Sequence, residues 1–255
     1  MGNRKNKMTK IKRALISTWD KSNLKNLLKL LKKEKVELIS SGGTYREIRK
    51  LGFKCNEVSS FTGSTEILNG RVKTLHPKIH AGILSKRNNI NHKKELKKNN
   101  FLEIDLVVVN FYPFEKTLEG TNNHDVILEN IDIGGPAMVR AAAKNYKDVA
   151  VITNPNQYKD LINELIKNKG STSLTFRQKF SKEAFVETAY YDALIANYLN
   201  NLFGEKFPKR KIIFANLIEK LRYGENPHQE SAVYSFSKKI NLYQLSGKKL
   251  SYNNY

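Results

Sequence analysis

Short apolar runs alternate with amphipathic segments along the first part of this chain, and this alternation restricts the possible folds more than any other feature. Arg13–Thr18, residues 36–40, 105–110 and 148–153 are apolar runs of strand length. Between the first two, residues 23–33 carry leucines at helical spacing. Strands that alternate with helices predict an α/β fold, with a mostly parallel sheet and helices on both faces.

The remaining segments extend this pattern toward the C-terminus. Residues 44–51 and 136–145 are predicted to be helices, and residues 53–58 a further strand. From residue 156 to about 201 the pattern becomes helical, and its aromatic side chains are expected to pack in the core. A linker is predicted at residues 207–210, and new material begins at Ile212.

Composition narrows the classes of partner. No apolar run in the 255 residues approaches the roughly 20 needed to span a bilayer, so we expect a cytoplasmic protein without membrane contact. The single cysteine, Cys55, excludes an internal disulfide and a cysteine-based metal cage. The net charge of +21 suggests nucleic acid, but the lysines are spread along the whole chain rather than clustered in a stripe. We expect no nucleic-acid partner, although a positive field would favour a phosphorylated small molecule.

A glycine turn after the second predicted strand is the first candidate site. Residues 41–44, Ser-Gly-Gly-Thr, stand before a helix, where glycines let backbone N–H groups approach an anion. Asp20 and Lys21 follow the first strand, and the carboxyl ends of parallel strands share one edge of the sheet. A tight turn with a purely structural role explains the glycines equally well.

A basic segment at residues 70–77, Gly-Arg-Val-Lys-Thr-Leu-His-Pro, is the second candidate. Arg71 and Lys73 alternate around a valine, so in an extended segment they share one face and could clamp a phosphate or polarise a carbonyl. His76 and His80 are four residues apart, but the proline between them argues against a helical pair of metal ligands. We therefore expect structural histidines and no metal.

Polar residues also follow the most apolar predicted strand and precede the alanine-rich helix. Asn110 and Tyr112 can donate and accept hydrogen bonds, although a strand cap with a packed tyrosine fits them as well. Asp132 precedes a glycine turn and could simply cap the helix that follows. Lys144 ends that helix, where a lysine also favours the helix dipole. Individually these residues are ordinary.

Taken together, the motifs resemble those of a known family, the bifunctional IMP cyclohydrolase and AICAR transformylase of purine biosynthesis. The segments SGGT, GRVKTLHPKIHAG, NFYPF and ENIDIGGPAMVRAAAKNY occur in the order and spacing of the cyclohydrolase, and the resemblance covers residues 10–201. Further on, LRYGENPHQ, QLSGK and LSYNN resemble the opening of the transformylase. The resemblance implies a methylglyoxal-synthase-like α/β fold, followed by a helical segment and an incomplete second domain.

The resemblance implies residues 10–201 as the IMP cyclohydrolase domain and residues 212–255 as a truncated fragment of the AICAR transformylase domain. The cyclohydrolase closes the ring of a formamido-imidazole-carboxamide ribotide to inosinate, a small ribonucleotide, and needs no cofactor. The transformylase uses 10-formyltetrahydrofolate, and its catalytic lysine–histidine pair lies further on in the family. We therefore expect no transformylase activity, with Arg222 and Tyr223 as orphaned nucleotide contacts. The family also implies a homodimer.

The site residues follow from the same resemblance. Asp132 would accept or orient the amide proton, Lys73 and Lys144 would donate protons and stabilise an oxyanion, and Tyr112 would position the base. The substrate-binding residues it implies are Asp20, Lys21, Ser41, Gly42, Gly43, Thr44, Arg71, Thr74, Asn110, Ile133 and Gly134. Trp19 departs from the family, which usually has a smaller residue there. A non-catalytic effector-binding module with the same fold is the rival reading, and it would not need the catalytic set.

Overall fold

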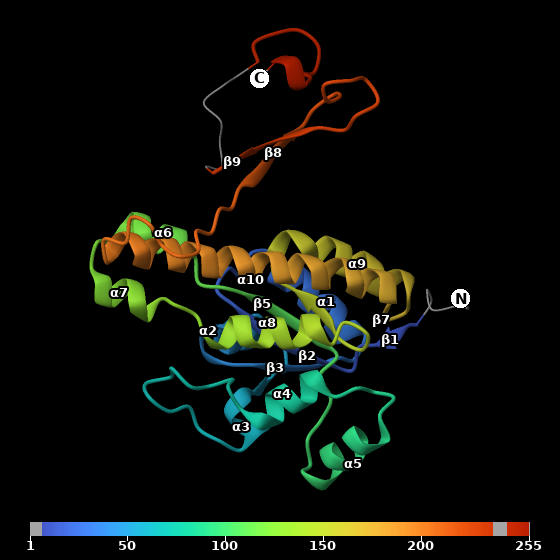
Figure 1. Ribbon diagram of the computed structural model, residues 1–255. Coiled ribbons are helices and arrows are strands. Elements are labelled where there is room, and N and C mark those ends of the chain that lie inside the picture. Colours follow the sequence, from blue (N-terminus) through green and yellow to red (C-terminus); the bar gives the residue numbers. More distant parts are fainter. Residues whose placement is uncertain (1–6, 237–243, 255) are drawn as a thin grey trace. The chain divides into compact units, whose positions relative to one another are not determined.

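The structure is a computed structural model that describes residues 7–236 and 244–254 (Figure 1). It contains two compact units, a first that ends at Asp192 and a second, Ala193–Tyr255. Within the described residues, no helix is long and apolar enough to cross a membrane.

A five-stranded parallel sheet forms the centre of the first unit. In spatial order its strands are β4 (Asn56–Glu57), β3 (Glu37–Ser40), β2 (Arg13–Thr18), β5 (Leu106–Asn110) and β6 (Ala150–Ile152). The chain moves outward from β2 through β3 to β4, then crosses back to β5 on the other side of β2. The strand order therefore reverses between β2 and β5.

Helices cover both faces of this sheet, as Figure 1 shows. One face packs against α1 (Leu24–Lys33), α2 (Gly42–Lys50) and α9 (Tyr158–Lys167). The other packs against α3 (Val58–Thr62), α4 (Pro77–Leu84) and α8 (Gly134–Lys144). The long helix α10 (Leu174–Leu202) contributes Phe180 to the first core and Ala184 to the second.

Strand β5 shows why the central strands are apolar throughout. Leu106 and Val108 pack into one core, and Val107 and Val109 pack into the other. Successive side chains of a strand point to opposite faces, so a strand covered on both sides buries every residue. The predicted α/β fold, with a mostly parallel sheet between helices, is confirmed.

Smaller elements surround this centre. In the first unit they are β1 (Thr9–Lys10), which pairs antiparallel with β7 (Ser171–Thr172), and α5 (Ile90–Lys98), α6 (Phe114–Gly120), α7 (His124–Glu129) and the 3-10 turn η2 (Pro155–Gln157). In the second unit β8 (Asn216–Lys220) pairs antiparallel with β9 (Ala232–Ser235), and η3 (Tyr252–Asn254) is a 3-10 turn.

Several predicted boundaries were wrong. Helices α2 and α8 each begin two residues earlier than predicted, because the glycines taken as turns form their first turns. The predicted strand at residues 53–58 has only two paired residues, and Val58 already opens α3. Pro77 begins α4 rather than interrupting it, since proline suits a first helical turn, and His76 caps that helix by accepting the N–H of Lys78 at Nδ1 (3.0 Å).

A buried arginine ties several segments together at the amino end of the strands. Arg177 of α10 is fully buried, and its guanidinium donates to carbonyl oxygens of Lys7, Tyr146, Lys147 and Thr172. Burial lowers its pKa to about 10, so it stays charged at neutral pH. These bonds join the N-terminal segment, the loop before β6 and β7.

We expect Arg177→Met to lower the free energy of unfolding by roughly 3 kcal/mol or more, because several buried carbonyls lose their donor. Urea unfolding followed by the fluorescence of Trp19, the only tryptophan and a residue of the first unit, measures this. Lys179→Met on the same helix is the control: its ion pair with Asp160 is half-exposed and is expected to contribute less than about 1 kcal/mol. Equal losses in both variants would contradict the role of Arg177.

Candidate active site at the carboxyl edge of the sheet

The loops that follow β2 and β5 meet where the strand order reverses. In open α/β sheets this switch point, outside the carboxyl ends of the strands, is where ligands bind. The N–H of Asp20 donates to Asn110 Oδ1 and the Asn110 amide nitrogen donates to the carbonyl of Asp20, each at 2.9 Å. Asn110 thus holds the two loops together through one bond at each end of its amide.

Helix α2 is fixed to the same edge by a second reciprocal pair. The hydroxyl of Thr44 accepts the N–H of Thr18 and donates to the carbonyl of Thr18, both at 2.9 Å. Thr44, which the resemblance implies as a substrate-binding residue, is buried, and its hydroxyl joins β2 to α2. These two pairs bring the ends of β2 and β5 and the N-terminus of α2 together, as the sequence predicted.

The N-terminus of α2 has the features of an anion site. Gly42 has φ of +53°, a left-handed conformation that favours glycine. A Cβ placed on Gly42 would lie 3.5 Å from Lys73 Nζ, so the ammonium group stands beside this turn. Ser41, the residue before the helix, makes no side-chain capping bond. Gly43 follows in the first turn, where helix N–H groups lack intrahelical partners.

A hollow of about 180 Å³ adjoins this turn. Its lining consists of Ser41, Glu57, Val58, Ser59, Ser64, Thr65, Glu66 and Lys73. Glu66 Oε2 lies 3.0 Å from Lys73 Nζ, and more than half of the Glu66 side chain is exposed. Sequence reasoning did not identify Glu66, since nothing in its local pattern marks it as a partner of Lys73.

The basic segment reaches a second helix N-terminus through Thr74. A Cβ placed on Gly134 would lie only 2.6 Å from the hydroxyl of Thr74, so the first turn of α8 and this buried threonine are in close contact. Residues 71–74 therefore connect the N-termini of α2 and α8. Arg71 diverges from Lys73, because its guanidinium lies 3.4 Å from Glu129 in an exposed ion pair.

Asp132 stands at the start of α8. Its Oδ1 accepts the N–H of Gly135 at 2.8 Å, and a side chain at position 135 would collide with the carboxyl group. Burial raises the pKa of the Asp132 carboxyl, an effect that the Gly135 N–H opposes. The neighbouring Ile133 is exposed. A carboxyl group whose pKa is raised toward neutrality is suited to proton transfer.

Two aromatic side chains and two charged groups complete the rim. Trp19 and Tyr112, at the ends of β2 and β5, are each 47% exposed. The Asp20 carboxylate accepts the N–H of Ser22, and hydrogen bonding to Ser22 lowers its pKa. Lys21 Nζ donates to the Trp19 carbonyl at 3.0 Å, so in this structure it bonds within its own loop.

The structure does not bring Lys144 to this cluster. Lys144 is exposed in the last turn of α8, whereas Asp132 precedes its first turn, and the rise of the helix from Gly134 to Lys144 is about 15 Å. Helix α10 runs beside α8 and contacts both ends: Ser181 donates to the carbonyl of Ala143, and the Asp132 N–H donates to Tyr191. The expected four-residue catalytic set is therefore not assembled within one chain.

The predicted nucleotide contacts of the second unit lie next to one another. Arg222 donates to the hydroxyl of Tyr223 at 3.0 Å, and its guanidinium lies 4.7 Å from the centre of that ring. Hydrogen bonds from Ser251 and Arg222 lower the pKa of Tyr223. Their polar groups thus contact each other within the second unit.

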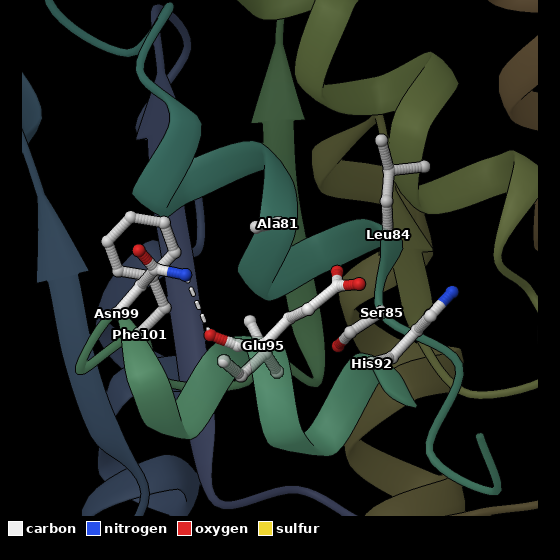
Figure 2. Close-up of a pocket in the computed structure, with 8 residues that line it drawn as sticks. Ala81, Leu84, Ser85, His92, Glu95, Asn99 and Phe101 are labelled. Carbon is white, nitrogen blue, oxygen red and sulfur yellow. Dashed lines mark hydrogen bonds between the residues drawn. The ribbon is translucent and has the colours of Figure 1, made fainter. Parts of the chain in front are cut away.

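A larger hollow, of about 330 Å³, lies between α4 and α5 (Figure 2). Its polar groups serve local structure: Asn99 donates to the carbonyl of Glu95 at 2.8 Å, and His92 Nδ1 accepts the N–H of Lys86 at 3.0 Å. Across the described residues, no group of three or more His, Cys, Asp or Glu side chains could hold a metal ion. The carboxyl edge is therefore the better candidate site.

Comparison with protein families matches both parts of the chain. Residues 23–137 match the MGS-like domain, and residues 142–255 match the AICARFT/IMPCHase bienzyme. Among solved structures, the crystal structure of ForH aligns with a TM-score of 0.65 and 30% identity, over 73% of this chain and 97% of ForH. The methylglyoxal-synthase-like fold is thus confirmed.

Curated relatives agree. The bifunctional purine biosynthesis protein PurH of Bradyrhizobium diazoefficiens is 46% identical over 96% of this chain and 47% of its own length. The PurH proteins of Persephonella marina and Bacillus subtilis are 47% and 46% identical, again over 96% of this chain. The chain spans about half the length of these relatives. It belongs to the PurH family of bifunctional purine biosynthesis enzymes.

Proposed function

We propose that the carboxyl edge of the sheet carries out the IMP cyclohydrolase reaction, the dehydrative ring closure of 5-formamido-imidazole-4-carboxamide ribotide to inosinate. In this reaction the carboxamide nitrogen attacks the formyl carbon, a C–N bond forms, and the formyl oxygen leaves as water. An amide nitrogen is a poor nucleophile. Catalysis therefore has to hold the two groups together, remove a proton from nitrogen and stabilise charge on oxygen.

The observation that carries this proposal is the placement of Lys73 Nζ beside the left-handed Gly42 at the N-terminus of α2. Helix N–H groups and an ammonium group together bind a phosphate monoester well. We assign the ribotide phosphate to this turn, with Ser41 and Gly43 as further contacts. Lys73 then acts mainly on the phosphate rather than as a proton donor. Its half-exposed pair with Glu66 is weak enough for a phosphate to displace.

The reacting groups would lie toward α8. Asp132 is suited to take the amide proton, because burial raises its pKa toward the working pH. The N–H of Gly134, at the first residue of α8, can donate to the developing oxyanion, since the Gly135 N–H already bonds Asp132 and Pro136 has none. Tyr112, exposed at the end of β5, is assigned to the formyl oxygen as a hydrogen-bond donor. Thr74 and Asn110 shape the site by holding its walls.

The remaining properties are proposed on family grounds. We propose a cytoplasmic homodimer that takes a small ribonucleotide as its partner and uses no cofactor for ring closure. The formyl transfer of the family takes 10-formyltetrahydrofolate as its cosubstrate. An effector-binding module is the rival, and it requires no group with the raised pKa of Asp132.

Purified chain is expected to convert the formylated ribotide to inosinate, which absorbs differently in the ultraviolet. A spectrophotometric assay with the isolated ribotide measures the rate against an enzyme-free blank. Tight binding of the ribotide without inosinate formation would favour the effector-binding module over the enzyme.

Lys73→Gln is expected to weaken binding of inosine monophosphate by about 10- to 100-fold, since a charge-assisted bond to phosphate contributes about 1.5–3 kcal/mol. Glu66→Gln should strengthen the binding of inosine monophosphate, because no carboxylate then competes with the phosphate for Lys73. Fluorescence of Trp19 at the rim reports binding, and inosine, which lacks the phosphate, should bind both variants equally. Lys97→Gln on α5 is the charge-matched control. If Lys73→Gln lost the same affinity for inosine as for inosine monophosphate, the assignment of the phosphate to the N-terminus of α2 would be wrong.

Asp132→Asn is expected to lower kcat by on the order of 10²-fold or more. In the parent chain kcat should fall as pH drops through the raised pKa, since the base must be ionised, and the variant should lose this acid limb. A raised folded-state pKa means that the ionised carboxylate costs stability above that pKa, a cost that disappears as pH falls. The variant should therefore unfold no more easily than its parent at pH 7. A kcat unchanged across the pH range would remove Asp132 from the chemistry.

A further inference from the structure

We propose that Tyr191 of α10 is a positioning residue for this site, which fixes the turn that carries Asp132 through the tyrosine hydroxyl. The inference rests on the proposed function, because it matters for turnover only if Asp132 acts on the substrate. Nothing in the sequence pattern marks Tyr191, which lies in the long helix whose aromatic residues predict packing alone.

The hydroxyl of Tyr191 contacts the turn at two points. It accepts the backbone N–H of Asp132 at 2.8 Å and donates to the carbonyl of Asn130 at 3.4 Å. The side chain is only 4% exposed, so water does not easily replace it. Burial raises the pKa of the phenol to about 12, which keeps it neutral and able to fill both roles.

The ring of Tyr191 connects this turn to the segment that follows β5. The centre of its ring lies 5.0 Å from that of the Phe111 ring and 6.2 Å from that of the Phe114 ring. The first pair is tilted and the second is edge-on, and aromatic pairs prefer such arrangements to face-to-face stacking. Phe111 directly precedes Tyr112, and it directly follows Asn110. One side chain thus links the loop of Asn110 and Tyr112 to the turn of Asp132.

The turn also packs on Thr74 at Gly134, and the Ile131 N–H donates to the carbonyl of Leu128 at 3.0 Å, but neither contact involves Asp132 itself. Ile133 precedes α8 without a side-chain cap, and among the residues that the structure describes the Asp132 carboxylate bonds only the N–H of Gly135, within its own turn. That local bond would survive a rotation of the whole turn. Within the described residues, the hydrogen bond to Tyr191 ties Asp132 to another helix, so it sets where the carboxylate points.

The test compares Tyr191→Phe with Tyr190→Phe in the full chain. Both remove one hydroxyl from neighbouring positions of α10, but the Tyr190 hydroxyl bonds Glu115 rather than Asp132. Tyr191→Phe keeps the aromatic contacts, so both variants should fold, and thermal unfolding checks this. Tyr191→Phe should lower kcat about 10-fold and leave KM for the formylated ribotide within about 3-fold, whereas Tyr190→Phe should change neither. A kcat at the parental level, or a change confined to KM, would overturn the proposal.

A double-mutant cycle asks whether Tyr191 acts through Asp132. In the Asp132→Asn background the Tyr191→Phe change should have no further effect on kcat, because the group it positions is gone. A full 10-fold loss there would overturn the proposal and assign Tyr191 a separate role.

Hydrogen exchange separates this inference from the proposed function. Amides of residues 130–135 should exchange faster in Tyr191→Phe than in the parent or in Tyr190→Phe, with or without turnover. If the parent chain forms no inosinate, the proposed function fails, and faster exchange still supports positioning of the turn. Unchanged exchange would overturn the proposal even in an active enzyme.

Discussion

The reciprocal hydrogen bonds between Asn110 and the backbone of Asp20 are the contact on which the site depends most. They join β2 and β5 at the place where the strand order reverses, and loops on either side of such a point otherwise diverge. The amide of asparagine can do this because it offers a donor and an acceptor on one planar group. A polar side chain at the edge of the candidate site thus has a structural role. Asn110 keeps one N–H and one acceptor lone pair beyond these two bonds, and its predicted contact with the purine base stays a prediction.

The two edges of the sheet use polar residues differently. At the amino edge, Arg177 and Asp105 are buried and bond backbone groups, with Asp105 accepting the N–H groups of Lys12 and Arg13. At the carboxyl edge, Tyr112 is half-exposed and Lys73 pairs with a solvent-exposed carboxylate, that of Glu66. Buried groups need fixed partners because desolvation is costly, whereas exposed groups can exchange a weak partner for a ligand. One edge therefore stabilises the fold and the other is available for chemistry.

The sequence predicted the parts of the fold that depend on local patterns. The strand Arg13–Thr18 and the leucine helix α1 follow from apolar spacing, and the glycine turns mark the two helix N-termini correctly. Exact helix starts could not be predicted, because Gly42 takes a left-handed conformation inside the first turn. The contact of Tyr191 with Asp132 could not be predicted, since the two residues are 59 positions apart. Glu66 is only seven residues from Lys73, but no regular helix or strand spacing relates the two, so the pattern gave no sign of their ion pair.

The position of Lys144, by contrast, could have been predicted from the length of the helix that carries it. A helix predicted between residues 136 and 145 places its ends about 15 Å apart at 1.5 Å per residue, so Asp132 and Lys144 could not meet in one chain. The resemblance grouped them by role, and a shared role does not require a shared surface. What Asp132 does have is a buried partner, Tyr191, and a raised pKa that costs the folded chain stability. The hydrogen bond between these two residues therefore carries the proposed chemistry at the start of α8, with no part for Lys144 of the same chain.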